Sequence, residues 1–227
     1  MCFSAGASFA GGAIITAVGV MTVRKNSEPS RRLFAAIPLV FGVQQISEGF
    51  VWVALQSPGH DLMLTLATYI FLLAAVVLWP FVIPLSMLLM ERSPARRRTL
   101  WVFLAAGIMT SLYYGTGLLL YNVDPEISSH HIKYSNEFPR HLADVAFAAY
   151  LLATLVPLFL SGARRMWILG VFMTASCLVT GIFYKEFLTS IWCFFAAIIS
   201  VVILWIISEK SQEERDSLSP QSNTLII

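Results

Sequence analysis

Seven long apolar stretches constrain the fold of this chain more than any other feature of its sequence. A helix needs about 20 apolar residues to cross roughly 30 Å of hydrocarbon, and each stretch is close to that length. Only 12% of the residues are charged, about half of the share that is usual in soluble domains. We therefore expect an all-α, polytopic membrane protein, with a seven-transmembrane-helix bundle over residues 1–207 and a disordered cytoplasmic tail over residues 208–227. The expected helices are Phe3–Val23, Leu33–Leu55, Leu62–Met90, Leu100–Tyr121, Leu142–Leu160, Met166–Tyr184 and Phe187–Ile207.

The orientation of the bundle follows from its basic residues, because Lys and Arg accumulate in the cytoplasmic loops of membrane proteins. The loops after the first, third and fifth stretches, together with the tail, hold 12 of the 15 Lys and Arg residues, and the opposite side holds Lys133, Arg140 and Lys185. This distribution predicts an N-terminus outside and a C-terminus inside. No basic residue precedes the first stretch, so it does not look like a cleavable signal peptide. The expected location is the cell (inner) membrane of a multi-pass protein.

The second stretch carries the most informative polar residues, because a polar side chain inside a membrane helix is costly. Gln44, Glu48 and Trp52 recur at four-residue steps, and Gln45 lies three residues before Glu48. These four side chains therefore share a broad face of one helix. Glu48 would lie roughly 10 Å below the outer end of the helix at 1.5 Å per residue. This face is either a functional pocket or a set of structural hydrogen bonds between helices.

Other reactive residues also fall in the outer half of the predicted bundle. Tyr134 lies in the long outer loop Asn122–Arg140, and Asp144 begins the fifth stretch, where it could also pair with Arg140. Cys2 begins the first stretch, and Cys193 lies at a depth in the seventh that is similar to that of Glu48. The predicted ligand-binding residues are Gln44, Gln45, Glu48, Trp52, Tyr134 and Asp144. The predicted metal ligands are His131, Cys193 and Cys2, for a transition metal such as zinc, iron or copper.

Small residues and prolines indicate how the helices pack. Steps of four or seven residues separate small side chains in three stretches, which is typical of close helix–helix contacts. Trp79-Pro80 and Pro84 predict a kink in the second half of the third stretch. The small residues are Ser4, Ser8, Gly12 and Thr16 in the first stretch, Gly107, Ser111 and Gly115 in the fourth, and Gly170, Thr174 and Gly181 in the sixth.

Several short segments resemble an uncharacterised family of bacterial and archaeal membrane proteins that begin Met-Cys-Phe-Ser-Ala. The similarity extends from residue 1 to about residue 205. The resemblance implies that Cys2, Gln44, Gln45, Glu48, His131 and Cys193 belong together, and it implies no mechanism. The segments that carry it are Met1–Ala5, Phe41–Gln45, Glu48-Gly49, Trp79-Pro80, His131–Tyr134 and Trp192–Ala197.

Three functions remain open at the level of sequence, and we place binding of a small molecule, ion or metal in an outward-facing pocket, for sensing or transport, first. The second is a membrane-embedded metal-dependent hydrolase, which would resemble the seven-helix ceramidase and adiponectin-receptor group. That group's paired transmembrane histidines are missing here. The zinc ligands could come only from a set that needs the outer loop to fold inward, namely His130, His131, His141, Glu48 and Cys193. The third is a thiol redox protein that uses Cys2 and Cys193.

The partners expected from composition are the lipid bilayer and a small ligand. A net charge of +2 gives no reason to expect nucleic acid. No phosphate-binding loop, dinucleotide-binding glycine motif or haem-attachment motif is present, and the seventh stretch has no lysine for a retinal Schiff base. The sequence assigns no catalytic residue.

Overall fold

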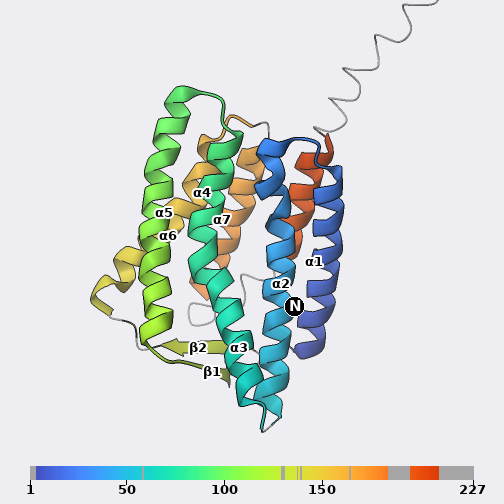
Figure 1. Cartoon of the computed structure of the whole chain (residues 1–227), viewed down its shortest axis with the longest axis vertical. Coiled ribbons are helices and arrows are strands. Elements are labelled where there is room, and N and C mark those ends of the chain that lie inside the picture. The colour runs from blue at the N-terminus through green and yellow to red at the C-terminus, as the bar shows by residue number, and fades with distance from the viewer. Residues whose placement is uncertain are drawn as a thin grey trace, which may run out of the picture.

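A bundle of long antiparallel helices forms the protein, and a short β-hairpin lies across one end of it (Figure 1). The computed structural model describes residues 4–57, 59–128, 131–136, 138, 140–163, 165–183 and 195–209, and for residues 136, 140, 141, 182 and 183 it describes the backbone alone. The helices are α1 (Ala5–Lys25), η1 (Pro29–Arg31), α2 (Arg32–Gln56), α3 (Asp61–Leu72), η2 (Leu73–Leu78), α4 (Trp79–Met90), α5 (Pro94–Leu120), α6 (Arg140–Leu160) and α7 (Met166–Phe183), followed by the unlabelled helix Phe195–Glu209.

Five helical segments in the described part of the chain are long and apolar enough to cross a membrane. They are Ala5–Lys25, Pro29–Gln56, Asp61–Met90, Pro94–Leu120 and Leu142–Leu160. The apolar helices Met166–Gly181 and Phe195–Glu209 are shorter, and residues 184–194 between them lie outside the description. The chain therefore has the character of a multi-pass membrane protein. Of the expected tail, only Ser208 and Glu209 are described, and both belong to the last helix.

Helices α1 and α2 pack along faces made of small residues. A Cβ atom on Gly12 would lie 2.6 Å from Ile46 Cγ1, and one on Gly42 would lie 2.2 Å from Thr16 Oγ1. Thr16 donates its hydroxyl to Gly12 O at 2.7 Å, so this hydroxyl is bonded within its own helix. The small-residue face expected on the first stretch is thus a helix–helix contact, in which backbones approach because side chains are nearly absent.

The third membrane-crossing segment, Asp61–Met90, consists of α3, η2 and α4, and we call it the third rod. Its helical geometry changes in the middle. Residues Leu73–Leu78 form the π-helix η2, which is followed directly by Trp79-Pro80. A π-helix bonds each carbonyl to the N–H five residues later, and Pro80 has no N–H to give to Ala75. Tyr150 of α6 donates its hydroxyl to the Ala75 carbonyl instead, at 2.8 Å. The prolines predicted to kink this stretch thus coincide with a break in its regular α-helical bonding.

The proline-rich part of this rod also accepts contacts from α5. Ser111 donates to the Val77 carbonyl at 2.6 Å. Pro84 cannot donate to the Pro80 carbonyl four residues before it, and Gly107 packs directly against that carbonyl. Two of the three small residues predicted for packing on this helix therefore make the contact, and the third, Gly115, has only the Val77 methyl groups nearby at 3.9 Å.

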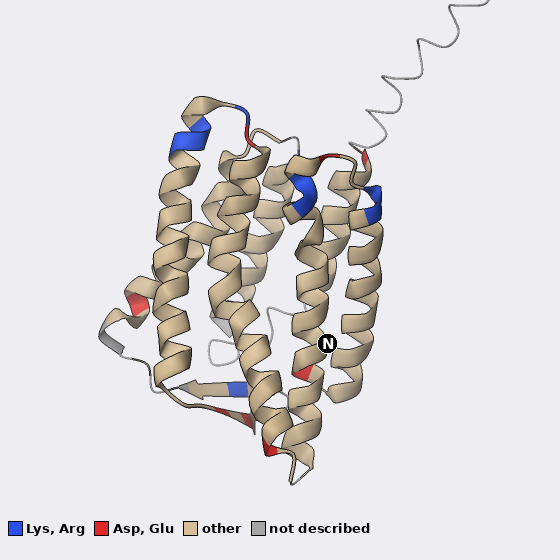
Figure 2. Ribbon diagram, in the orientation of Figure 1, with Lys and Arg blue, Asp and Glu red and all other residues tan. Residues whose placement is uncertain are grey.

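Lys and Arg gather at the end of the bundle opposite the hairpin, which we call the basic end (Figure 2). Helix α5 begins there at Pro94, so Arg96 and Arg97 lie on its first turns rather than in a loop as the sequence suggested. Arg97 Nη1 donates to the carbonyls of Leu88 and Glu91 at 3.0 and 3.2 Å, which satisfies two carbonyl groups at the end of α4. The basic residues therefore also shape the connection between helices.

Glu91 is the buried acceptor at the centre of this basic end, with 7% of its surface exposed. It accepts hydrogen bonds from the backbone N–H groups of Arg92, Ser93 and Gly162 at 3.0, 2.9 and 2.7 Å. Burial alone would raise the pKa of Glu91, but these three donors and the nearby Arg96 outweigh it and lower the pKa below its ordinary value. The carboxylate thereby ties the α4–α5 connection to the α6–α7 connection.

The outer loop of the sequence analysis folds into a hairpin of β1 (Val123–Ser128) and β2 (His131–Asn136). The two strands pair antiparallel, with Pro125 opposite Tyr134 and Ser128 opposite His131. We call this the hairpin end of the bundle. Sequence analysis missed these strands, although Ile132 and Tyr134 alternate with polar residues in the manner of a half-buried strand.

Candidate functional site

A buried carboxylate on α2 forms the centre of the candidate site. Glu48 is 0% exposed, and Gln45, one helical turn away, is also 0% exposed. Gln45 Nε2 donates to Glu48 Oε2 at 2.9 Å. The three-residue spacing that predicted a shared helical face therefore yields a direct amide–carboxylate hydrogen bond.

A second hydrogen bond connects this face to the third rod. The indole Nε1 of Trp79 donates to Gln44 Oε1 at 2.9 Å, and both residues are almost fully buried. The Trp79 ring also lies against Phe41, with 4.2 Å between ring centroids. Because Trp79 follows η2 directly, the π-helical segment determines the position along α2 at which this indole makes contact.

Three buried polar atoms near these hydrogen bonds have no hydrogen-bond partner among the residues that the structure describes. They are Gln45 Oε1, the indole Nε1 of Trp52, and Thr68 Oγ1 on α3. Trp52 is 3% exposed and Thr68 is 1% exposed, so water does not reach them from the surface. Thr68 follows Ala67, which packs in the same apolar cluster as Trp52. Each orphaned group costs about 1–3 kcal/mol of desolvation that nothing recovers.

The hairpin covers the end of α2 that carries Trp52. Ile132 is 1% exposed and belongs to the cluster formed with Val51, Trp52 and Ala67. Tyr134 stacks on Phe71 of α3, with ring centroids 4.9 Å apart and an angle of 17° between the rings. The hairpin thus closes the bundle one helical turn beyond Glu48.

The sequence-predicted residues divide into three groups. Gln44, Gln45, Glu48 and Trp52 lie together on the buried face of α2, and Tyr134 joins them at the hairpin end. Asp144 is exposed on the first turns of α6, on the outside of the bundle. Cys2 and Cys193 lie outside the described residues, so their meeting stays a prediction.

The metal hypothesis also stays a prediction, because only one of its ligands is described. His131 is buried, with 7% of its surface exposed, at the start of β2. Within the described residues, no three or more His, Cys, Asp and Glu side chains form a group that could hold a metal ion. His130 and the side chain of His141 fall outside that description.

Sequence reasoning missed two residues of the site. Trp79 was noted for its proline neighbour and as part of a family segment, and Thr68 was not singled out. Each side chain has a single polar atom and lies in an apolar run, so its position beside α2 shows only once the segment Asp61–Met90 is placed against that helix.

A comparison with known families matches residues 1–217 to DUF6629, a family of unknown function. The chain belongs to this family. Membership confirms the resemblance to an uncharacterised family that the short sequence segments indicated, and it assigns no activity. No curated protein and no solved structure matches the chain.

Proposed function

We propose that this member of DUF6629 is a multi-pass protein of the cell membrane that binds a small cation or hydrogen-bonding molecule at Glu48. In this proposal seven helices span the bilayer, and the hairpin end faces outward. The site lies near that end and serves sensing or transport. A transition metal bound with His131, Cys2 and Cys193 is one form that the ligand could take.

The observation that carries the proposal is the set of unpartnered atoms around a buried carboxylate. Gln45 Oε1 can only accept a hydrogen bond, and Trp52 Nε1 can only donate one. Both atoms are buried and have no partner within the described part of the chain, and their residues flank Glu48 on one face of α2. A ligand that donates to the amide oxygen or accepts from the indole recovers part of the desolvation cost. Purely structural polar networks are usually satisfied completely.

The charge at this position favours a cationic or proton-carrying ligand. Glu48 is 0% exposed within the membrane-crossing part of α2 and accepts a hydrogen bond from Gln45. A buried carboxylate in hydrocarbon is costly, and binding of a proton or a cation lowers that cost. The indole of Trp52, one turn away, adds an electron-rich ring that suits an organic ammonium ion.

Thermal unfolding in the presence of candidate ligands tests the proposal. Purified protein in detergent would be titrated with protons, Na⁺, K⁺, Mg²⁺, Zn²⁺ and tetramethylammonium. A probe at 100 times its dissociation constant stabilises the folded state by about 2.7 kcal/mol, which corresponds to roughly 5–10 °C in Tm for a chain of this size.

Two variants separate the site from general charge effects. We expect Glu48→Gln to abolish the Tm increase, and Glu126→Gln to keep it, because Glu126 is an exposed hairpin residue paired with Lys133 at 3.6 Å. An equal increase in wild type and Glu48→Gln would refute the proposal. So would the absence of any increase in wild type across the whole panel.

A further inference from the structure

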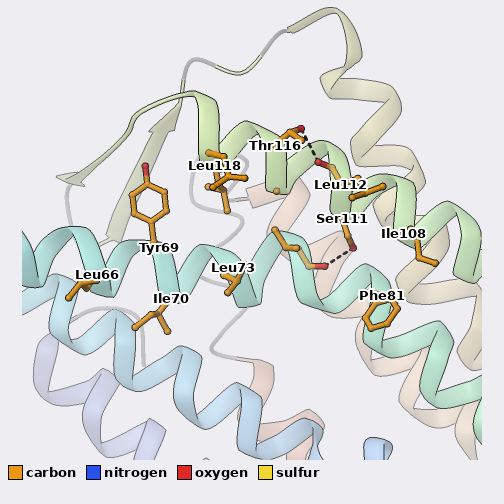
Figure 3. A pocket seen from close by; sticks show the side chains of 13 residues that line it. Leu66, Tyr69, Ile70, Leu73, Phe81, Ile108, Ser111, Leu112, Thr116 and Leu118 are labelled. Atoms are coloured by element: carbon orange, nitrogen blue, oxygen red, sulfur yellow. Dashed lines mark hydrogen bonds between the residues drawn. The ribbon is translucent and has the colours of Figure 1, made fainter.

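An open apolar groove runs along the outside of the bundle, away from the Glu48 site. It lies between the third rod and α5 and has a volume of about 760 Å³ (Figure 3). Leu66, Ile70 and Leu73 form part of one wall, and Leu112, Gly115 and Leu119 form part of the other. Both walls belong to membrane-crossing helices, so the groove opens into hydrocarbon.

The groove exists because α5 follows only part of the rod. Helix α5 packs along α4 and η2, where Gly107 meets the Pro80 carbonyl and Ser111 bonds to the Val77 carbonyl. Beyond η2, α3 leans away from α5 toward the hairpin end (Figure 1). Gly115 lies where the two helices separate, and its missing side chain leaves the floor of the groove open.

The walls offer an occupant no hydrogen bond along most of their length. The Ser111 hydroxyl is committed to Val77 O, and the Thr116 hydroxyl is committed to the carbonyls of Leu112 and Tyr113 at 2.8 and 2.9 Å. Water would find too few partners there. Hydrocarbon fits because it needs only van der Waals contact, and an empty groove would forfeit that contact.

The length and direction of the groove suit a lipid chain better than a protein helix. Leu66 to Phe81 spans about 22 Å along the rod, which exceeds the roughly 15 Å of one leaflet and falls short of the full 30 Å that a spanning helix must cross. Tyr69 lies toward the hairpin end, with its hydroxyl directed away from α3 toward the side on which the strands lie (Figure 3). Tyrosine is favoured at this level because its ring is apolar and its hydroxyl reaches the polar interface.

We propose that this groove binds one acyl chain of a membrane phospholipid, with the ester region of the lipid beside the Tyr69 hydroxyl. The chain lies along Leu73 and Gly115 and fills the space that the bend at η2 opens. The lipid is held more tightly than its neighbours because it contacts protein on two sides. This site is independent of the function proposed for Glu48.

Photo-crosslinking tests the proposal directly. The full-length protein would be reconstituted in phosphatidylcholine bilayers that contain a phospholipid with a diazirine in its acyl chain, irradiated, digested and mapped by mass spectrometry. We expect labelling of the groove residues on α3 and α5 to exceed labelling of Val102 and Met109 by at least fivefold. The latter two residues are 66% and 67% exposed on α5 and lie outside the groove.

A filled groove and a matched control complete the experiment. Gly115→Leu places a side chain in the floor of the groove, where its Cβ atom meets only the Val77 methyl groups at 3.9 Å. It should reduce groove labelling at least fivefold, whereas Ala105→Leu, on an exposed position of α5 outside the groove, should not. Uniform labelling around α5, or labelling unchanged by Gly115→Leu, would show bulk lipid only and overturn the proposal. Disulfide-linked dimers of a Leu112→Cys variant in the bilayer would overturn it in favour of a second copy.

Discussion

Two glycines on α5 should respond in opposite directions to the same substitution. A Cβ atom on Gly107 would lie 1.8 Å from the Pro80 carbonyl oxygen, whereas one on Gly115 would find the Val77 methyl groups at 3.9 Å. Carbon and carbonyl oxygen rest at about 3.3 Å or more, so Gly107→Ala requires α4 and α5 to separate locally by about 1.5 Å. The obstructing atom is backbone, so no rotamer change can relieve the clash.

The expected magnitudes follow from packing and helix propensity. Overpacking of this kind costs typically 1–3 kcal/mol, and replacing glycine by alanine in a helix returns up to about 1 kcal/mol. A clash with backbone places Gly107→Ala at the upper end of that range, about 3 kcal/mol, so we expect a net loss of about 2 kcal/mol of unfolding free energy after this gain. Gly115→Ala should gain roughly 0.5–1 kcal/mol, since only the propensity change operates there.

Thermal unfolding of both variants in one detergent, followed by tryptophan fluorescence, measures the difference. The corresponding Tm changes are a decrease of about 4–8 °C for Gly107→Ala and an increase of roughly 1–4 °C for Gly115→Ala. A Gly107→Ala protein as stable as wild type would show that α5 does not approach the Pro80 carbonyl. The reasoning that links the prolines to the position of α5, and hence to the groove, would then fail.

Three further results are expected. Tyr150→Phe should lower the unfolding free energy by about 1–3 kcal/mol, because it leaves the buried Ala75 carbonyl without its donor; an unchanged Tm would contradict this. Glu91 has a folded-state pKa below its ordinary 4.5, so its contribution to stability is fully present above pH 4.5 and is lost as the pH falls toward the folded-state pKa. Glu91→Gln should therefore flatten the dependence of Tm on pH in that range. An unaltered profile would show that other carboxylates cause the dependence. For topology, a fluorescent protein fused after Ile227 should be active and alkaline phosphatase at the same place inactive, and the reverse pattern would overturn the proposed orientation.

The class of the protein could be predicted from local sequence, because membrane-crossing segments are recognised by length and apolar content alone. The buried face of α2 could also be predicted, because residues three and four apart share a helical face. Gln44, Gln45, Glu48 and Trp52 are all buried as that spacing implied. The packing role of Gly12 and Thr16 followed from the same argument.

The partners of these residues could not be predicted, because they come from distant parts of the chain. Gln44 bonds to Trp79, 35 residues later, and Tyr150 bonds to Ala75 across 75 residues. The bounds of η2 could not be predicted either. Proline indicates a disturbed helix, but it does not specify which residues leave the α-helical pattern or which carbonyls accept from new donors.

The sequence by itself therefore determined that this is a membrane helical protein, where its basic residues lie, and which side of α2 is polar. These properties depend on composition and on the 3.6-residue period of a single helix. Tertiary structure decided that Trp79 donates to Gln44 on the face of α2 that carries Glu48, that a hairpin covers Trp52, and that α3 and α5 separate to leave a groove. Each of these depends on the relative placement of helices, which is fixed by side-chain packing between segments far apart in the chain.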